Sequence, residues 1–519
     1  MIYRLYRSGI FWLCCLAACP LAGGAQSPIV STGSGPVQGA IENDLAVFRG
    51  LPFAAPPVGE QRWREPQPVQ PWSAVRQAST VGASCPQKRG LALEGGGDPG
   101  TINEDCLYLN VFTPRAEPGA KLPVMVWIHG GALIFGGGGL PLYDGSALAR
   151  RGAVVVTLNY RLGNLGFFTH PALEQERPGG PVNFGLLDQI AALQWVRQNI
   201  EAFGGDPTKV TVFGQSAGAQ SVLALMASPL SAGLFHGAIA ESPYAFPGHT
   251  RAKAAATGAA IADAVGLPGA RAGMDALRQI PAERLSALEG KEVSLTTSFI
   301  TGDAAVPLPL LEVFQQGREA AVPLVIGSNS DDASVVLAFG IDPAQAVQKL
   351  GMARRMVKAF YPEVKDERQL GLALGRDVGF TAFARRISYL HSRKSPTWRY
   401  YFSHTGAGTA TSPGASGPTG AGHGAEVPYV MGTTRQCQCL GQPATPLDLA
   451  VEDRIGDRWV AFSATGKPEG QVAWPQDNRG RGVVLDIGNQ DTVRPAFMSA
   501  RLNTIITGLK WAGSRAARE

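Results

Sequence analysis

The fold of this chain is decided by the stretch Lys209-Val210-Thr211-Val212-Phe213-Gly214-Gln215-Ser216-Ala217-Gly218-Ala219. Its first five residues form a short run rich in β-branched side chains, which is typical of a strand buried in a sheet. The residues after the second glycine, 219–227, are mostly strong helix formers. Ser216 therefore lies in a tight turn from a strand into a helix. Glycine on both sides lets the backbone bend while the serine hydroxyl stands clear of it.

Similar elements lie on both sides of this stretch. Short apolar runs at 123–128, 153–158 and 322–327 predict further buried strands. Between them lies an amphipathic helix that ends near Gly204-Gly205. The apolar face of this helix consists of Leu186, Ile190, Leu193, Val196 and Ile200. Alternating strands and helices predict an α/β fold, with a mostly parallel central sheet flanked by helices and long loop excursions.

Ser216 is the candidate nucleophile, and a serine hydroxyl needs a base that is itself oriented by an acid. At a strand–turn–helix serine of this kind the chain order is serine, acid, histidine. Of the seven histidines only His391, His404 and His423 follow a plausible acid. His391 lies in a predicted helix, and His404 ends the run 398–403. Glycines on both sides of His423 leave its side chain free to reach a cleft, so we predict His423 as the base, with His404 as the alternative.

Two acids are candidates for orienting that base. Asp331 and Asp332 both follow the strand that ends at Gly327, at the carboxyl edge of the sheet where sites assemble. Spacing alone does not separate them.

Backbone donors for an oxyanion are the third requirement of such a site. The segment His129-Gly130-Gly131-Ala132 follows a predicted strand, where its N–H groups can face a developing negative charge. Ala217, directly after the serine, supplies a further N–H group. Together these parts predict acyl transfer through a covalent intermediate.

Composition excludes several other classes of function. The chain has 519 residues, with 46 Lys and Arg against 41 Asp and Glu, and this net charge of +5 is too small for a nucleic-acid-binding surface. Hydrophobic residues make up 45% and charged residues 17%, enough for a large core. No zinc-ligand spacing and no HExxH motif occurs, so we expect neither a metal nor a cofactor.

The N-terminus has the pattern of a secretory signal. Arg4 and Arg7 precede an apolar run at 10–18, and small residues continue to Ala25. We therefore expect residues 1–25 to be a signal peptide and 26–519 to be a single catalytic domain, secreted or periplasmic. Alternatively, Leu16-Ala17-Ala18-Cys19 resembles a lipoprotein signal, which would anchor the protein through a lipid on Cys19. No later run reaches the length of a membrane span.

Four cysteines remain after the signal. Cys85 and Cys106 are well spaced to close a loop, and a bridge of that size stabilises a fold by about 3 kcal/mol. Cys437 and Cys439 are two residues apart, where a mutual bond would be strained, so we expect buried or free thiols. The segment 405–422 contains only Gly, Ala, Ser, Thr and Pro and is predicted to be a mobile loop.

At the level of longer strings, the chain resembles the type-B carboxylesterases, the α/β-hydrolase family that includes cholinesterases and para-nitrobenzyl esterases. The matching strings are FRGLPFAAPPVG at 48–59, EDCLYLNV at 104–111, NYRLG at 159–163, FGGDP at 203–207 and the run 213–219. The resemblance extends from about residue 37 to residue 475.

The resemblance implies a serine carboxylesterase that hydrolyses small neutral esters through an acyl-enzyme. It implies a triad of Ser216, Asp332 and His423, and an oxyanion hole of Gly131, Ala132 and Ala217. It favours Asp332 over Asp331, although the family more often has Glu at this position. It also implies a disulfide between Cys85 and Cys106 and a structural ion pair between Arg161 and Asp188.

The sequence departs from the family at positions that bear on which class of ester the site accepts. Cholinesterase-like members hold a quaternary ammonium against aromatic rings, but 86–105 contains no aromatic residue and Val335-Val336 follow the acid. With Leu133 and Ile134 after the glycine loop, we expect an aliphatic pocket and no preference for choline esters. Gln215 replaces a Glu that many members carry beside the serine. The other functions left open are a binding protein on the same fold, and a thioesterase or lactonase.

Overall fold

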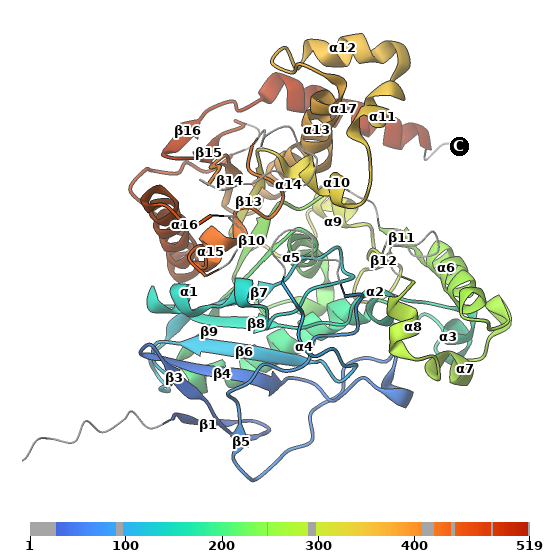
Figure 1. The fold of residues 1–519 in the computed structure, drawn as a ribbon, viewed down its shortest axis with the longest axis vertical. Helices are drawn as coiled ribbons and strands as arrows, with labels where there is room; N and C mark the ends of the chain where they lie inside the picture. Colours follow the sequence, from blue (N-terminus) through green and yellow to red (C-terminus); the bar gives the residue numbers. More distant parts are fainter. Residues whose placement is uncertain are drawn as a thin grey trace, which may run out of the picture.

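The protein is described by a computed structural model for residues 27–89, 97–245, 248–288, 297–406, 420–436, 442–478 and 481–516. Within these residues one large twisted sheet runs through the molecule (Figure 1). Its strands, in spatial order, are β16 (Asp491–Arg494), β15 (Val484–Ile487), β14 (Thr397–Phe402), β13 (Leu324–Asn329), β10 (Gly237–Glu241), β9 (Gly205–Gln215), β7 (Leu122–Ile128), β8 (Val154–Leu158), β6 (Tyr108–Thr113), β4 (Leu45–Pro52) and β3 (Ala40–Glu42). Neighbouring strands from β15 to β8 are all parallel, and β16, β6, β4 and β3 are antiparallel to their neighbours. The predicted mostly parallel sheet is therefore confirmed.

Smaller elements surround this sheet. Two short sheets are formed by β1 (Ile29–Thr32), β2 (Gly35–Gln38) and β5 (Arg76–Gln77), and by β11 (His249–Thr250) and β12 (Ile300–Thr301). The helices before β13 are α1 (Ser146–Arg150), α2 (Gly163–Gly166), α3 (Pro171–Glu176), α4 (Phe184–Asn199), α5 (Ala217–Ala227), α6 (Arg251–Ala264), α7 (Met274–Arg278), α8 (Ala282–Ser286) and α9 (Leu310–Gln316). The later helices are α10 (Val335–Ala338), α11 (Pro343–Gln348), α12 (Arg354–Ala359), α13 (Glu367–Arg376), α14 (Ala382–His391), α15 (Val427–Met431), α16 (Pro446–Thr465) and α17 (Ser499–Ala516).

Both faces of the central sheet are buried, which explains why its strands are almost wholly apolar. Along β7, Val124, Val126 and Ile128 pack into one core, and Met125 and Trp127 pack into the other. This alternation is the two-residue period of a strand. The first core is closed by α4, α5 and α14, and the second by α1, α15 and α16. Helices therefore cover each face, as the alternation of elements predicted.

The helix predicted across 186–200 is confirmed as α4. Its apolar face packs entirely into the first core. A 3-10 turn, Ile200–Phe203, extends the helix to Gly204, whose φ of 85° ends it. The next strand, β9, is longer than the apolar run suggested. It begins at Gly205 because Gly205 pairs with Leu122 of β7, beyond a register irregularity.

Two predicted stabilising contacts are confirmed. A disulfide joins Cys85 and Cys106. Arg161 and Asp188 form a fully buried fork, with Nε–Oδ2 and Nη2–Oδ1 distances of 2.8 and 2.7 Å. The fork therefore connects the segment that follows β8 to helix α4.

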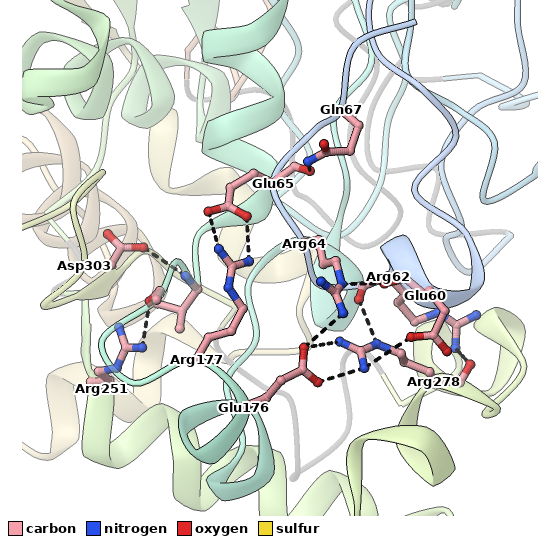
Figure 2. A network of polar contacts seen from close by, with 12 residues as sticks. Glu60, Arg62, Arg64, Glu65, Gln67, Glu176, Arg177, Arg251, Arg278 and Asp303 are labelled. Atoms are coloured by element: carbon pink, nitrogen blue, oxygen red, sulfur yellow. Dashed lines mark hydrogen bonds and ion pairs between the residues drawn. The ribbon is translucent and has the colours of Figure 1, made fainter. Parts of the chain in front are cut away.

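A second charged network lies nearer the surface and joins the loop around Glu65 to the helices that follow β8 (Figure 2). Arg177 donates two hydrogen bonds to Glu65, at 2.6 and 2.7 Å. Glu176 accepts two from Arg278 of α7 and lies 3.3 Å from Arg64. These forked pairs connect segments that are distant in sequence.

Several predictions concern residues outside the described ranges. These are the signal peptide with Cys19, the pair Cys437 and Cys439, and most of the predicted loop at 405–422. Within the described part of the chain, no helix combines the length and apolar character that a membrane crossing requires.

The buried fork at Arg161 yields a stability prediction. In Asp188→Ala the guanidinium stays buried without its carboxylate, so we expect the free energy of unfolding to fall by about 3–5 kcal/mol in urea titrations. The control is Asp453→Ala, which removes an exposed partner of Arg151 and should change stability by less than about 1 kcal/mol. Similar losses in both variants would contradict the structural role of the fork.

Candidate active site

Ser216 stands at the sharpest turn of the sheet edge. It joins the end of β9 to the start of α5 with φ 57° and ψ −120°, a backbone conformation that residues other than glycine rarely adopt. Its N–H donates to the carbonyl of Glu241 at 2.8 Å, which ties the turn to β10. The positive φ is strain of the kind found at functional positions. It turns the serine side chain out of the strand, as the motif predicts.

The two glycines of the motif are required by a close approach rather than by their own φ. A Cβ on Gly214 would lie 2.5 Å from the carbonyl oxygen of Ile128, and one on Gly218 would lie 2.0 Å from it. Helix α5 therefore begins directly against the end of β7. This contact also brings the loop after β7 beside the serine, since a Cβ on Gly130 would lie 3.3 Å from the Cβ of Ser216.

The structure places His423 against Asp332. His423 Nδ1 lies 2.9 Å from Asp332 Oδ1, and the backbone N–H of Asn329 donates to Asp332 Oδ2 at 2.6 Å. Asp332 is completely buried after the end of β13. Asp331 instead pairs through its backbone with Ala421 and Gly422. Of the two acids that the sequence left open, Asp332 is thus the one whose carboxylate meets the imidazole.

The other ring nitrogen of His423 faces the residue beside the serine. Gln215 Nε2 lies 3.2 Å from His423 Nε2. Because the Asp332 carboxylate accepts from Nδ1, a neutral ring carries its proton there and Nε2 is left as the acceptor. This is the neutral tautomer that a general base requires. Gln215 is therefore a direct neighbour of the imidazole, a contact that the sequence alone did not reveal.

The loop after β7 presents unused backbone donors. Gly131, Ala132 and Leu133 have φ values of 103°, 52° and 63°, a run of left-handed conformations that turns the peptide groups. Among the described residues, the N–H groups of Gly131, Ala132 and Ala217 donate to no protein acceptor. These are the donors that the sequence predicted for an oxyanion.

His129 supports this loop and is not a base. It is buried, stacks on Tyr160 with ring centroids 4.4 Å apart, and contacts the carbonyl of Gly130 through Nδ1 at 2.8 Å. Burial lowers its pKa to about 4, so the ring is neutral at physiological pH.

Three buried carboxyl groups share the space behind the imidazole. Glu426 accepts a hydrogen bond from the side chain of Asn329, and Glu241 accepts one from Trp459 Nε1 at 2.8 Å. Burial, followed by the charge of Asp332, raises the pKa of Glu426 to about 7. Burial and the charge of Glu426 raise the pKa of Glu241 well above its usual range. The burial of this cluster therefore raises the pKa of both glutamates beside Asp332.

The remaining candidate histidines lie elsewhere and have structural partners. His404 bridges Asn489 and Asp448, with 2.8 Å to each. His391 lies in α14, as predicted, and bridges Glu319 and the carbonyl of Val322. Neither contacts the turn at the serine through these bonds.

Sequence reasoning missed three neighbours of His423. The Ser334 hydroxyl accepts the N–H of His423 at 2.9 Å, the ring of Phe380 lies 5.1 Å from the imidazole, and Glu426 lies one turn further along. The position of Glu426 in the sequence could have pointed to it, because a glutamate three residues after a candidate base can lie close to that base. Phe380 had none, because its contact depends on how α13 and α14 pack.

Comparison with known proteins gives a consistent assignment. The sequence profile described as "Carboxylesterase family" matches residues 26–373 and 362–505. Fumonisin B1 esterase of Sphingopyxis macrogoltabida is 36% identical, covering 93% of this chain and 91% of that protein. Para-nitrobenzyl esterase of Bacillus subtilis is also 36% identical, covering 90% and 96%.

Solved structures agree with this assignment. A thermophilic PNB esterase superposes with a TM-score of 0.79 at 33% identity, covering 92% of this chain and 99% of that one. The carboxylesterase of Geobacillus stearothermophilus superposes with a TM-score of 0.77 at 28% identity, again covering 92% and 99%. With its parallel sheet, its strained serine turn and these relatives, the chain belongs to the type-B carboxylesterases of the α/β-hydrolase fold and is a carboxylic ester hydrolase.

Proposed function

We propose that this enzyme hydrolyses neutral carboxylic esters through an acyl-enzyme on Ser216, with His423 as general base and Asp332 as the acid that orients it. The observation that carries the proposal is the 2.9 Å contact between His423 Nδ1 and Asp332 Oδ1, which leaves Nε2 of a neutral ring as the basic atom. A base in that state is ready to remove the proton of a neighbouring hydroxyl.

The proposed reaction has two halves. His423 takes the proton from Ser216 as its oxygen attacks the ester carbonyl, and then donates that proton to the leaving alcohol. In the second half, His423 activates a water molecule that releases the acid and restores the serine. The N–H groups of Gly131, Ala132 and Ala217 stabilise the oxyanion in both halves, each by about 3–4 kcal/mol in the transition state.

We propose an aliphatic acyl or alcohol pocket as the source of specificity. Leu133 and Ile134 are buried in the loop after β7, and Val335 and Val336 follow Asp332. Phe380 adds one aromatic wall next to His423. Relatives are named for fumonisin B1 and para-nitrobenzyl esters, so we propose small or extended neutral esters rather than choline esters.

We also propose export of the catalytic domain 26–519 after removal of residues 1–25. The disulfide between Cys85 and Cys106 supports this, because such bonds persist in oxidising compartments.

The first prediction about the proposed reaction concerns the candidate nucleophile. Ser216→Ala should lower kcat for p-nitrophenyl butyrate by about six orders of magnitude, as in a dissected serine protease triad. The comparison uses a panel of p-nitrophenyl esters and a choline ester, with Ser221→Ala in α5 as the matched control. Retained turnover in Ser216→Ala would refute the mechanism, and a preference for the choline ester would refute the aliphatic pocket alone.

The second prediction concerns Gln215. In Gln215→Glu a carboxylate faces His423 Nε2 and favours the protonated ring, which cannot act as a base. The acid limb of the pH profile of kcat/KM should therefore move to higher pH by about one unit. Gln215→Met is the neutral control and should leave the midpoint of that limb in place. An unmoved limb in Gln215→Glu would show that this side chain does not set the state of the base.

The third prediction concerns Glu426, whose pKa is raised from 4.5 to about 7 in the folded protein. The folded state holds this proton more tightly, so the stabilisation is complete below pH 4.5 and is lost as pH rises through about 7. The loss amounts to about 3 kcal/mol. Glu426→Gln should remove this part of the pH dependence of unfolding in urea, measured at pH 5 and 8. Glu469→Gln, at an exposed position, should leave it unchanged, and identical pH slopes in wild type and Glu426→Gln would contradict the assignment.

A further inference from the structure

A long excursion from the central sheet, between β13 and β14, contains Asp332 near its start and carries an unusual surface. It runs through α10, α11, α12 and α13 before the chain returns to the sheet, and α12 lies at the outer end of the molecule (Figure 1). Among the described residues, thirteen large hydrophobic side chains are exposed, and five of these lie within 339–360. They are Phe339, Ile341, Met352, Met356 and Phe360.

The apolar residues around α12 lie along one side of it. The 3-10 turn Gly351–Ala353 runs straight into the helix, so Met352, Met356 and Phe360 recur every four residues on one face. Met352 is 98% exposed and Met356 is 65% exposed. Monomeric proteins rarely leave such side chains together in water without a partner.

This exposed side is not needed to fold the excursion. The excursion has its own core of Val347, Tyr361 and Leu370, and Val357 packs on it from the inner side of α12. Tyr361 donates to Asp377 at 2.9 Å, and Arg501 stacks on its ring at 4.4 Å. Met352 and Met356 therefore lie on the outer side of a helix whose inner side is already packed.

Basic residues lie beside the apolar ones. From residue 344 to residue 362 the chain has four basic residues and no acidic residue. Arg354 pairs with Glu367 of α13. Arg355 and Lys358 have no ion-pair partner within the described ranges. At 3.6 residues per turn, Arg355 lies about 60° around α12 from Met352, and Lys358 lies about 60° further round on the same side.

We propose that this surface, defined as Met352, Arg355, Met356, Lys358 and Phe360, docks the enzyme on an anionic phospholipid surface. Methionine and phenylalanine side chains at the end of a helix enter the boundary between headgroups and acyl chains, and neighbouring cations bind the lipid phosphates. The excess of basic residues between 344 and 362 favours an anionic lipid surface over a second copy of this chain, whose matching patch carries the same positive charge.

Docking of this kind has a consequence for substrate supply. The surface belongs to the excursion that contains Asp332, so the enzyme would take esters that partition into lipid. This consequence rests on the proposed function, but docking itself does not and can be measured with the inactive Ser216→Ala protein.

The test is flotation of the full chain with vesicles. We expect binding to vesicles of equal phosphatidylcholine and phosphatidylglycerol, weak binding to phosphatidylcholine alone, and loss of binding at about 0.5 M salt. Arg355→Gln with Lys358→Gln should weaken partitioning about 25-fold, which corresponds to about fivefold for each charge. Met352→Asp with Met356→Asp should abolish binding.

Matched variants separate the surface from general effects. Lys253→Gln with Arg271→Gln removes two exposed charges elsewhere, and Leu447→Asp changes an exposed apolar residue on α16. Both should bind like wild type. All variants should keep wild-type hydrolysis of p-nitrophenyl acetate in solution, since none of these residues contacts the candidate triad.

Three outcomes would overturn the proposal. One is equal binding to neutral and anionic vesicles, and another is wild-type binding by the two double variants of the surface. The third is a dimer in sedimentation velocity that Met352→Asp with Met356→Asp dissociates, because the surface would then be an interface between copies of the chain.

Discussion

The site depends on one packing contact, the approach of Gly214 and Gly218 to the carbonyl oxygen of Ile128. No side chain fits in that gap, because a Cβ on Gly218 would lie 2.0 Å from the oxygen. As a result, α5 starts against the end of β7, and the turn between β9 and α5 becomes so short that Ser216 adopts a positive φ. The same contact places the loop after β7 beside the serine. The strain is local, and the surrounding parallel strands, buried on both faces, are rigid enough to maintain it.

Charge is handled differently in the scaffold and near the candidate triad. In the scaffold, the buried guanidinium of Arg161 is matched by both oxygens of Asp188. Behind His423, three carboxyl groups share one region, and burial raises the pKa of Glu241 well above its usual range. Of the three, it is Asp332 whose Oδ1 lies 2.9 Å from His423 Nδ1. Removing water from the cluster therefore serves the orientation of the base.

The excursion between β13 and β14 links the site to the surface of the molecule. Its first turn carries the acid and its second turn carries Val335 and Val336, while α12 reaches the outer end of the fold. A single segment thus spans the distance from the carboxylate of Asp332 to the exposed methionines. Because Tyr361, Asp377 and Arg501 fix its base, the orientation of α12 relative to the sheet is set by packing.

The sequence by itself determined the fold class, because strands buried on both faces are continuous apolar runs and their helices show a clear period. It also predicted Ser216 as the nucleophile, since flanking glycines directly after a buried strand are typical of a nucleophile turn. The buried pair of Arg161 and Asp188 followed from the family resemblance and is confirmed. The sequence did not choose between Asp331 and Asp332 from spacing, since adjacent residues differ only in where the turn after β13 points them.

The family resemblance favoured Asp332, and the tertiary structure gives the physical reason: the backbone of Asp331 pairs with Ala421, and Asp332 turns toward His423. The tertiary structure alone revealed the contact of Gln215 with the imidazole and the shared burial of Glu241 and Glu426. These features join residues about 100 to 200 positions apart, and no local pattern records such proximity. Local periodicity specifies elements, whereas the state of a buried charge depends on every group that packing brings near it.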